Sequence, residues 1–231
     1  IVVIGANPTE NHPVAATYFK QAVKRGATLI VMDPRGQALK RHATHMLQFK
    51  PSSDVAMLNA IMHVIVEEGL YDRQYVEAHT EGFEQLKTHL TAYAPEKMSE
   101  ICGIEAETLR TVARTYPGAR TAIIFWGMGI SQHPHGTDNA RCLISLALMC
   151  GQVGRDGTGL HPLRGQNNVQ GASDAGLIPL VFPDYVSTRN DEKRRMFEDL
   201  WNTPLSPEPG LTVVEIMDAA HRRDIRSMYI M

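Results

Sequence analysis

One arginine stands among carboxamides in residues 161–171, which read His-Pro-Leu-Arg-Gly-Gln-Asn-Asn-Val-Gln-Gly. The guanidinium of Arg164 could hold a small carboxylate through two parallel hydrogen bonds, while Gln166 and the amides after it could bind a polar cofactor. A buried amide needs hydrogen-bond partners, so a solvated polar loop is the competing interpretation. Composition alone slightly favours the solvated loop.

Three further polar turns each follow a short apolar run. They are residues 5–10 (Gly-Ala-Asn-Pro-Thr-Glu), residues 33–35 (Asp-Pro-Arg) and residues 127–129 (Gly-Met-Gly). If the apolar runs are parallel strands, these turns lie outside the carboxyl ends of the strands, where open α/β sheets bind nucleotides. The sequence therefore predicts one binding edge that these turns share.

The residue types in these turns suit a nucleotide. Gly5 would let the chain turn closely against a ligand, and Asn7 offers side-chain hydrogen bonds. Asp33 stands where many dinucleotide folds hold a ribose or base edge, and Arg35 could pair with a phosphate. The turn at Gly5 is not a G-x-G-x-x-G motif. An ordinary turn aspartate beside a solvated arginine is an almost equal alternative.

Histidine and cysteine patterns predict no metal site. His133, His135 and His161 lie near the polar turns, but they have no carboxylate or cysteine partner in a ligand-like spacing, and we expect surface or supporting roles for them. Three cysteines, Cys102, Cys142 and Cys150, are not closely paired. They are typical of small apolar side chains in a core and favour a reducing, cytoplasmic location.

The apolar pattern predicts an α/β fold: a Rossmann-like parallel sheet flanked by helices, followed by the truncated start of a second α/β domain. Residues 1–166 would form the first domain and residues 167–231 the second. Strands are expected at 1–4, 27–32, 45–49 and 121–126, and helices at 13–25, 52–69, 105–116, 138–150, 191–200 and 213–222.

Three local expectations accompany this pattern. Val14, Tyr18 and Ala22 mark the apolar spacing of the helix at 13–25. Residues 151–176 read as a long loop, because they are rich in glycine and lack periodicity. The chain starts in a strand of buried type and stops on a strand-like apolar run, so we expect a fragment of a longer protein.

Composition excludes several classes of function. Hydrophobic residues make up 43% and charged residues 21% of the 231 residues, which predicts a folded globular chain. The formal net charge of −2 leaves no broad basic surface for nucleic acid. The apolar runs are far shorter than the roughly 20 residues of a membrane-spanning helix. We expect neither a nucleic-acid partner nor a membrane segment.

Strings throughout the chain resemble one family closely, the bis-molybdopterin guanine dinucleotide oxidoreductases, and within it the catalytic (alpha) subunit of formate dehydrogenases. They are IGANPTENHP at 4–13, VMDPR at 31–35, WGMGISQ at 126–132, LISLALMCGQVGR at 143–155 and RGQNNVQGASDAG at 164–176. The last string is the one that distinguishes formate dehydrogenases from nitrate and dimethyl sulfoxide reductases.

The resemblance implies roles for individual residues. Arg164 would orient formate. The residues that would contact the cofactor, together with their neighbours in the same loops, are Gly5, Asn7, Asp33, Arg35, Asp54, Gly127, Met128, Gly129, Gln132, Gly165 and Gln166. Family members often have glycine where Ser52 stands, and this departure weakens the assignment of Asp54.

The implied activity is oxidation of formate to carbon dioxide at a molybdenum or tungsten centre. The metal-ligating cysteine or selenocysteine and the iron–sulfur cysteines would lie upstream of Ile1, so the fragment alone should be inactive. Electrons would leave toward iron–sulfur and flavin or NAD-type subunits, with an NAD-linked cytoplasmic complex preferred. The alternatives are a stand-alone nucleotide-binding module without redox activity and another molybdopterin oxidoreductase acting on an oxo substrate.

Overall fold

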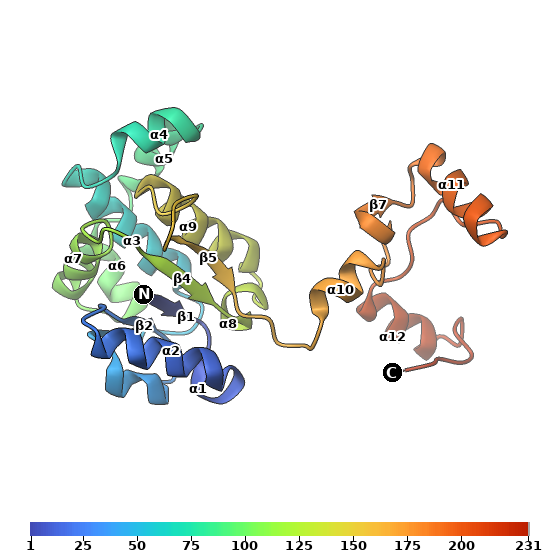
Figure 1. The fold of residues 1–231 in the computed structure, drawn as a ribbon, viewed down its shortest axis with the longest axis horizontal. Coiled ribbons are helices and arrows are strands. Elements are labelled where there is room, and N and C mark those ends of the chain that lie inside the picture. Colours follow the sequence, from blue (N-terminus) through green and yellow to red (C-terminus); the bar gives the residue numbers. More distant parts are fainter. Residues whose placement is uncertain (231) are drawn as a thin grey trace. The chain divides into compact units, whose positions relative to one another are not determined.

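The computed structural model describes residues 1–230, which form two compact units (Figure 1). The first unit is Ile1–Gly165, and the second begins at Gln166. The first unit contains a large sheet with helices on both faces, and the second contains short helices around one small strand pair.

Five parallel strands form the sheet of the first unit. They are β1 (Val2–Ile4), β2 (Ile30–Met32), β3 (His45–Leu47), β4 (Ile123–Trp126) and β5 (Gly159–Pro162). Their order is β3-β2-β1-β4-β5, which matches the first five strands of the doubly wound nucleotide-binding order. The predicted α/β fold with a parallel sheet flanked by helices is confirmed.

The strands bury both faces, as their continuous apolar runs predict. Val2 and Ile4 belong to one apolar cluster, whereas Val3 between them belongs to another. On the Val3 side lie α2 (Pro13–Lys24) and the 3-10 helix η1 (Ala38–His42). On the other side lie α3 (Asp54–Glu67), α6 (Pro95–Cys102), α7 (Ala106–Thr115) and α9 (Gly136–Met149).

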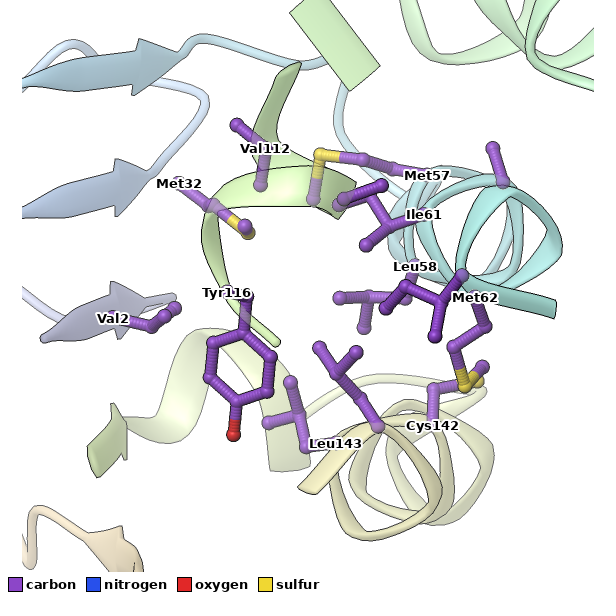
Figure 2. Close-up of a cluster of buried hydrophobic side chains, with 14 of the residues drawn as sticks. Val2, Met32, Met57, Leu58, Ile61, Met62, Val112, Tyr116, Cys142 and Leu143 are labelled. Atoms are coloured by element: carbon purple, nitrogen blue, oxygen red, sulfur yellow. The ribbon is translucent and has the colours of Figure 1, made fainter. Parts of the chain in front are cut away.

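The helix α3 is the centre of the larger cluster. Figure 2 shows Met57, Leu58, Ile61 and Met62 of α3 in one apolar cluster with Tyr116 and with Leu143 of α9. Helices on several sides of α3, including α5 (Phe83–Leu90), explain why its apolar residues are not confined to one stripe. The short helix α4 (Arg73–His79) adds Val76 to the same cluster.

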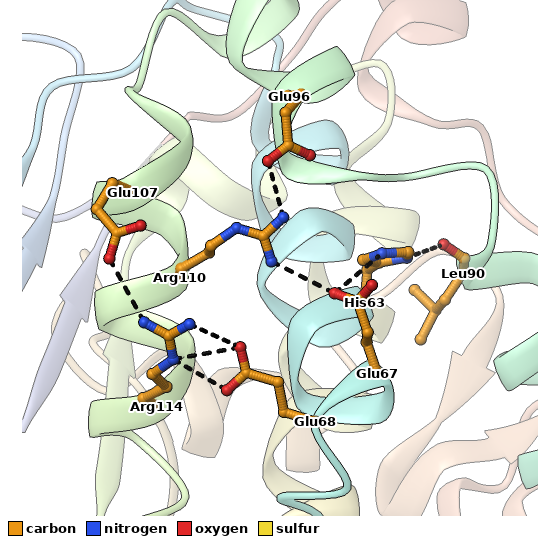
Figure 3. Close-up of polar contacts among 8 residues, drawn as sticks. All are labelled: His63, Glu67, Glu68, Leu90, Glu96, Glu107, Arg110 and Arg114. Carbon is orange, nitrogen blue, oxygen red and sulfur yellow. Dashed lines mark hydrogen bonds and ion pairs between the residues drawn. The ribbon is translucent and has the colours of Figure 1, made fainter.

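Ion pairs join the carboxyl end of α3 to α7 (Figure 3). Arg114 contacts Glu68 at 2.8 Å, and Arg110 contacts Glu67 at 3.3 Å. The same arginines also reach Glu107 and Glu96. These side chains are largely at the surface, where such pairs contribute little to stability. They join α3 to α7 at the end of α3 opposite Asp54.

Two elements occupy the stretch predicted as a long loop. Residues 159–162 form β5, parallel to β4, and Val169–Asp174 form the helix α10. The prediction of an unbroken loop over 151–176 was wrong. β5 is an edge strand that contains a glycine and a proline, both of which weaken the strand signal but are tolerated at an edge. Pairing with β4 makes this segment a strand, although its sequence does not have a strand pattern.

The buried face of α2 also differs from expectation. Val14 and Tyr18 are exposed, whereas Ala16 and Phe19 are buried. The ring of Phe19 packs against that of Phe125 with centroids 4.7 Å apart. Both candidate faces have helical spacing, and the position of β4 selects the one that carries Phe19.

The second unit combines helices with an antiparallel strand pair. Its elements are α10, β6 (Val181–Phe182), η2 (Pro183–Tyr185), β7 (Val186–Ser187), α11 (Asp191–Trp201) and α12 (Val213–His221). The last two helices are confirmed. The strand-like end is wrong, because residues 225–230 have no regular structure and no strand pairs with them. Within residues 1–230, no helix combines the length and apolar character needed to cross a membrane.

Candidate functional site

The polar turns lie side by side at the carboxyl edge of the sheet, which we call the rim: residues 5–11, 33–37, 48–54, 127–135 and 163–165. All five strands are parallel, so their loops emerge at this one edge. Backbone hydrogen bonds join neighbouring loops or strand ends: Asp33 N to Leu47 O (3.1 Å), Gly5 N to Met32 O (3.1 Å), Gly127 N to Ile4 O (3.3 Å) and Leu163 N to Trp126 O (2.7 Å). The rim is therefore one continuous surface.

Glycines allow two of these loops to touch through their backbones. Gly129 N donates to Gly5 O at 3.0 Å, and a Cβ on Gly129 would lie 2.8 Å from that oxygen. A Cβ on Gly127 would lie 2.7 Å from Gly5 O. Gly5 itself has φ +57°, which favours glycine. These glycines serve contact within the protein, and their role toward a ligand stays a prediction.

Asp33 is buried, and its carboxylate organises the loop after β2. One oxygen accepts a hydrogen bond from Arg35 N at 2.7 Å, and the other accepts one from the Gln37 amide at 3.4 Å. The same Gln37 amide donates to Ala6 O in the neighbouring loop. The side chain of Arg35 is exposed. Sequence reasoning missed Gln37, since an amide four residues after a turn aspartate is no specific signal.

Asn7 is buried in the loop after β1, just before the short helix α1 (Pro8–Asn11). Its side-chain oxygen accepts a hydrogen bond from Thr9 Oγ1 at 2.6 Å. Its backbone oxygen accepts from Glu10 N and Asn11 N, which starts the helical turn. Asn7 thus holds the shape of this loop, as asparagine often does in turns.

Asp54 lies at the amino end of α3 and is 3% exposed. Burial raises the pKa of its carboxyl, while a backbone hydrogen bond and the nearby His133 oppose this rise. Ser52 has φ +69°, a conformation in which glycine would be less strained. Both features agree with a tight turn at this part of the rim.

The short helix α8 (Met128–Ser131) extends the rim from β4. Gln132, directly after it, is exposed, and so is His135. His133 Nδ1 is buried without a hydrogen-bond partner among residues 1–230. His161 lies on β5, where its ring stacks on Phe125. The structure thus places His135 at the surface and His161 in a packing contact.

Arg164 is exposed in the loop after β5 and joins the rim through its backbone. His12, between α1 and α2, contacts Arg164 O through Nε2 at 2.6 Å. The terminal methyl of Met128 would be 3.3 Å from a Cβ on Gly165, so Met128 lies beside this loop. Sequence reasoning missed His12, because nothing near it in the sequence refers to a loop 152 residues away.

Gln166 belongs to the second unit, so its part in a site with the rim stays a prediction. Within that unit the amide-rich string forms a local turn and the helix α10. Asn168 has φ +51°, and a Cβ on Gly171 would lie 2.4 Å from the Asn168 side-chain oxygen. A Cβ at Gly171 would therefore force the Asn168 side chain to shift.

The rim presents two exposed arginines and two buried carboxylates. Exposed Arg35 and Arg164 can pair with anionic groups, and the carboxylates of Asp33 and Asp54 can accept from hydroxyl or ring N–H groups. Buried polar atoms without partners within residues 1–230 include Gln37 Oε1 and His133 Nδ1 of the rim and Nδ1 of His12, which directly follows the rim's first segment. No group of three or more His, Cys, Asp or Glu side chains in the described residues could hold a metal ion.

The chemistry of this donor set therefore fits a nucleotide-bearing cofactor. A parallel sheet in this order, with helices on both faces, defines a doubly wound α/β fold. The chain belongs to the molybdopterin oxidoreductase family, whose model matches residues 1–231. Membership implies a molybdopterin cofactor that carries molybdenum or tungsten.

Several curated relatives and solved structures resemble the chain, among them two formate dehydrogenases and an acetylene hydratase. It is 42% identical over 231 residues to the F420-dependent formate dehydrogenase subunit alpha of Methanocaldococcus jannaschii, covering 100% of this chain and 34% of the relative. It is 39% identical over 232 residues to formate dehydrogenase H of Escherichia coli, covering 100% and 32%. Acetylene hydratase from Pelobacter acetylenicus matches 68% of this chain and 22% of its own, with a TM-score of 0.64 and 29% identity. The chain thus spans about a third of the length of these curated relatives.

Proposed function

We propose that this chain is part of the catalytic subunit of a formate dehydrogenase containing molybdenum or tungsten. Its rim binds molybdopterin guanine dinucleotide, and Arg164 orients formate for oxidation to carbon dioxide. The observation that carries the proposal is the likeness, at about 40% identity and over the whole chain, to proteins named as formate dehydrogenases. The position of Arg164 at the rim supports the role assigned to it.

The rim residues divide the binding of the cofactor among them. Arg35 pairs with a phosphate, and Asp33 uses its remaining lone pairs for a ribose hydroxyl or a guanine N–H. A carboxylate has about four acceptor positions, so the two bonds from Arg35 N and Gln37 leave it capacity. Contacts with the cofactor are also proposed for Gly5, Asn7, Asp54, Gly127, Met128, Gly129, Gln132, Gly165 and Gln166.

Arg164 acts on the substrate by position and charge. Its planar guanidinium donates two parallel hydrogen bonds to the carboxylate of formate, which fixes the C–H bond in one direction. Oxidation of formate releases carbon dioxide, one proton and two electrons, and the cofactor supplies this redox chemistry when bound. The protein contributes orientation and a positive potential on the carboxylate side.

The electrons leave through iron–sulfur clusters outside this chain toward partner subunits. An acceptor of NAD type is proposed from the sequence resemblance, and the name of the M. jannaschii relative makes coenzyme F420 the competing acceptor. A reducing, cytoplasmic location is part of the proposal. The three cysteines support it, because all are buried as free thiols.

Formate-dependent dye reduction by the complete enzyme, with metal analysis of the same preparation, tests the proposal. We expect turnover of formate and bound molybdenum or tungsten. Nitrate, supplied with reduced dye, tests the alternative of an oxo substrate. Metal content without formate turnover would refute the proposal in favour of another molybdopterin oxidoreductase, and guanine-nucleotide binding without metal would favour a module without redox activity.

A further inference from the structure

His12 links two loops of the rim that are far apart in the sequence. Its Nε2 lies 2.6 Å from Arg164 O, across 152 residues. A carbonyl oxygen can only accept, so Nε2 carries the proton and donates it. Nδ1 of a neutral ring then holds a lone pair, and it is buried without a partner within the described residues. The contact therefore fixes the ring in one tautomer.

The contact with Arg164 lies just beyond the end of the sheet. The strand β5 stops at Pro162, and the backbone bond from Leu163 N to Trp126 O is the last one that ties this segment to β4. Gly165 is the last residue of the first unit. An arginine side chain has many rotamers, so the position of its backbone decides which of them reach the substrate.

We propose that His12 is a positioning residue that holds the backbone of Arg164 so that the guanidinium meets formate in one orientation. The inference rests on the proposed function, because it takes formate as the ligand of Arg164. His12 touches neither the substrate nor the reacting atoms in this account. Its effect is on the orientation of a charged side chain, through one hydrogen bond to the main chain.

Two substitutions separate the hydrogen bond from the ring. His12→Phe keeps an aromatic ring and removes the donor, whereas His12→Gln places an amide N–H near the former Nε2. In the complete enzyme, His12→Phe should raise the KM for formate about tenfold, which losing one hydrogen bond can cause. We expect a smaller change in kcat and normal metal content. His12→Gln should restore the KM to within about twofold.

Cleavage by trypsin gives a readout that needs no cofactor. Trypsin cuts after arginine, and Arg164 is exposed, so the rate of cutting between residues 164 and 165 reports how firmly this segment is held. In the complete enzyme, the His12→Phe variant should be cut at this bond several-fold faster than the original enzyme or the His12→Gln variant. Cutting after Arg35, at another exposed arginine of the rim, serves as the internal control.

The results of these experiments show whether His12 positions Arg164 or only fills space in the protein. Wild-type KM and wild-type cleavage in His12→Phe would overturn the proposal, and so would a raised KM that His12→Gln fails to restore. Should His12→Phe lose the metal, His12→Asn replaces it, since its shorter amide does not reach Arg164 O. Equal KM in the Asn and Gln variants then overturns the proposal. If the original enzyme does not oxidise formate, the proposed function is refuted. The comparison of cleavage rates would still test whether His12 holds the backbone of Arg164.

Discussion

The two units differ in how much of their chain is buried and in how many residues have a left-handed backbone. The first unit buries two apolar clusters, one on each face of its sheet. Among the described residues of the second unit, only Thr188, Phe197 and Ala219 are fully buried. Five of the six non-glycine residues with positive φ within residues 1–230 also lie in the second unit: Asn168, Asp184, Tyr185, Asn202 and Arg223. The sixth is Ser52 of the first unit.

The difference bears on the string that carries the candidate substrate residue. Arg164 and Gly165 end the first unit, where strand β5 and His12 fix the backbone. Gln166 opens the second unit, whose string is shaped by local turns. A motif that is continuous in sequence is thus held by long-range contacts on one side of a peptide bond and by short-range contacts on the other.

Core truncations should give the largest contrast between the units. Leu58→Ala removes a fully buried side chain of the larger cluster and should lower the stability of the first unit by about 3 kcal/mol. Phe197→Ala should lower protection only in the second unit, by roughly half as much, since its ring partners Phe182 and Trp201 are themselves partly exposed. Amide hydrogen exchange of each segment measures both effects. Leu200→Ala, at an exposed site, is the control, and equal losses for Leu58→Ala and Phe197→Ala would contradict the contrast.

Arg164 and Gln166 test the boundary within the string. In the complete enzyme, Arg164→Ala should lower kcat/KM for formate about 100-fold with normal metal content, because a charged bidentate contact is lost. Arg164→Lys keeps the charge without the fork and should lose less. Gln166→Ala, in the second unit, should change kcat/KM by no more than about fivefold. Equal activity of Arg164→Ala and the original enzyme would remove Arg164 from the substrate site.

The backbone contact between the Gly5 and Gly129 loops of the rim should be disrupted by adding one methyl group. Gly129→Ala forces a Cβ to within 2.8 Å of Gly5 O and should destabilise the first unit by about 2 kcal/mol in urea unfolding. Gly165→Ala is the matched control, because its Cβ meets only the flexible end of Met128, at 3.3 Å. Similar unfolding midpoints for the two variants would show that the rim tolerates movement of these loops.

Substitution of Ser52 should change the stability of the first unit least, and it should increase that stability. Ser52→Gly relieves a left-handed backbone and should stabilise the first unit by about 0.5 to 1 kcal/mol, after the greater freedom of glycine in the unfolded chain is subtracted. Ser53→Gly, at an ordinary φ, loses the bond from Ser53 Oγ to Lys50 O and should destabilise. The opposite signs are measurable by urea unfolding, and a loss of stability in both variants would contradict the assignment of strain.

Several features of this protein were determined by local sequence. Runs such as residues 1–4 and 27–32 are too apolar to be exposed and too short for helices, so they predict buried parallel strands. Polar turns after those runs must then meet at one edge of the sheet, which predicts the position of the rim. The strings at 4–13 and 164–176 carried the family resemblance, which the match to the molybdopterin oxidoreductase family confirmed.

Only the tertiary structure decided which residues of distant segments meet. Pairing with β4 makes a strand of residues 159–162, and packing against Phe125 selects the Phe19 face of α2 over the Tyr18 face. Gln37 reaches Ala6 across 31 residues, and His12 reaches Arg164 across 152. A hydrogen bond between such distant residues leaves no signal in the sequence around either of them. Neither the hydrophobic periodicity nor the composition of the two segments depends on it. Their meeting is a property of the assembled sheet.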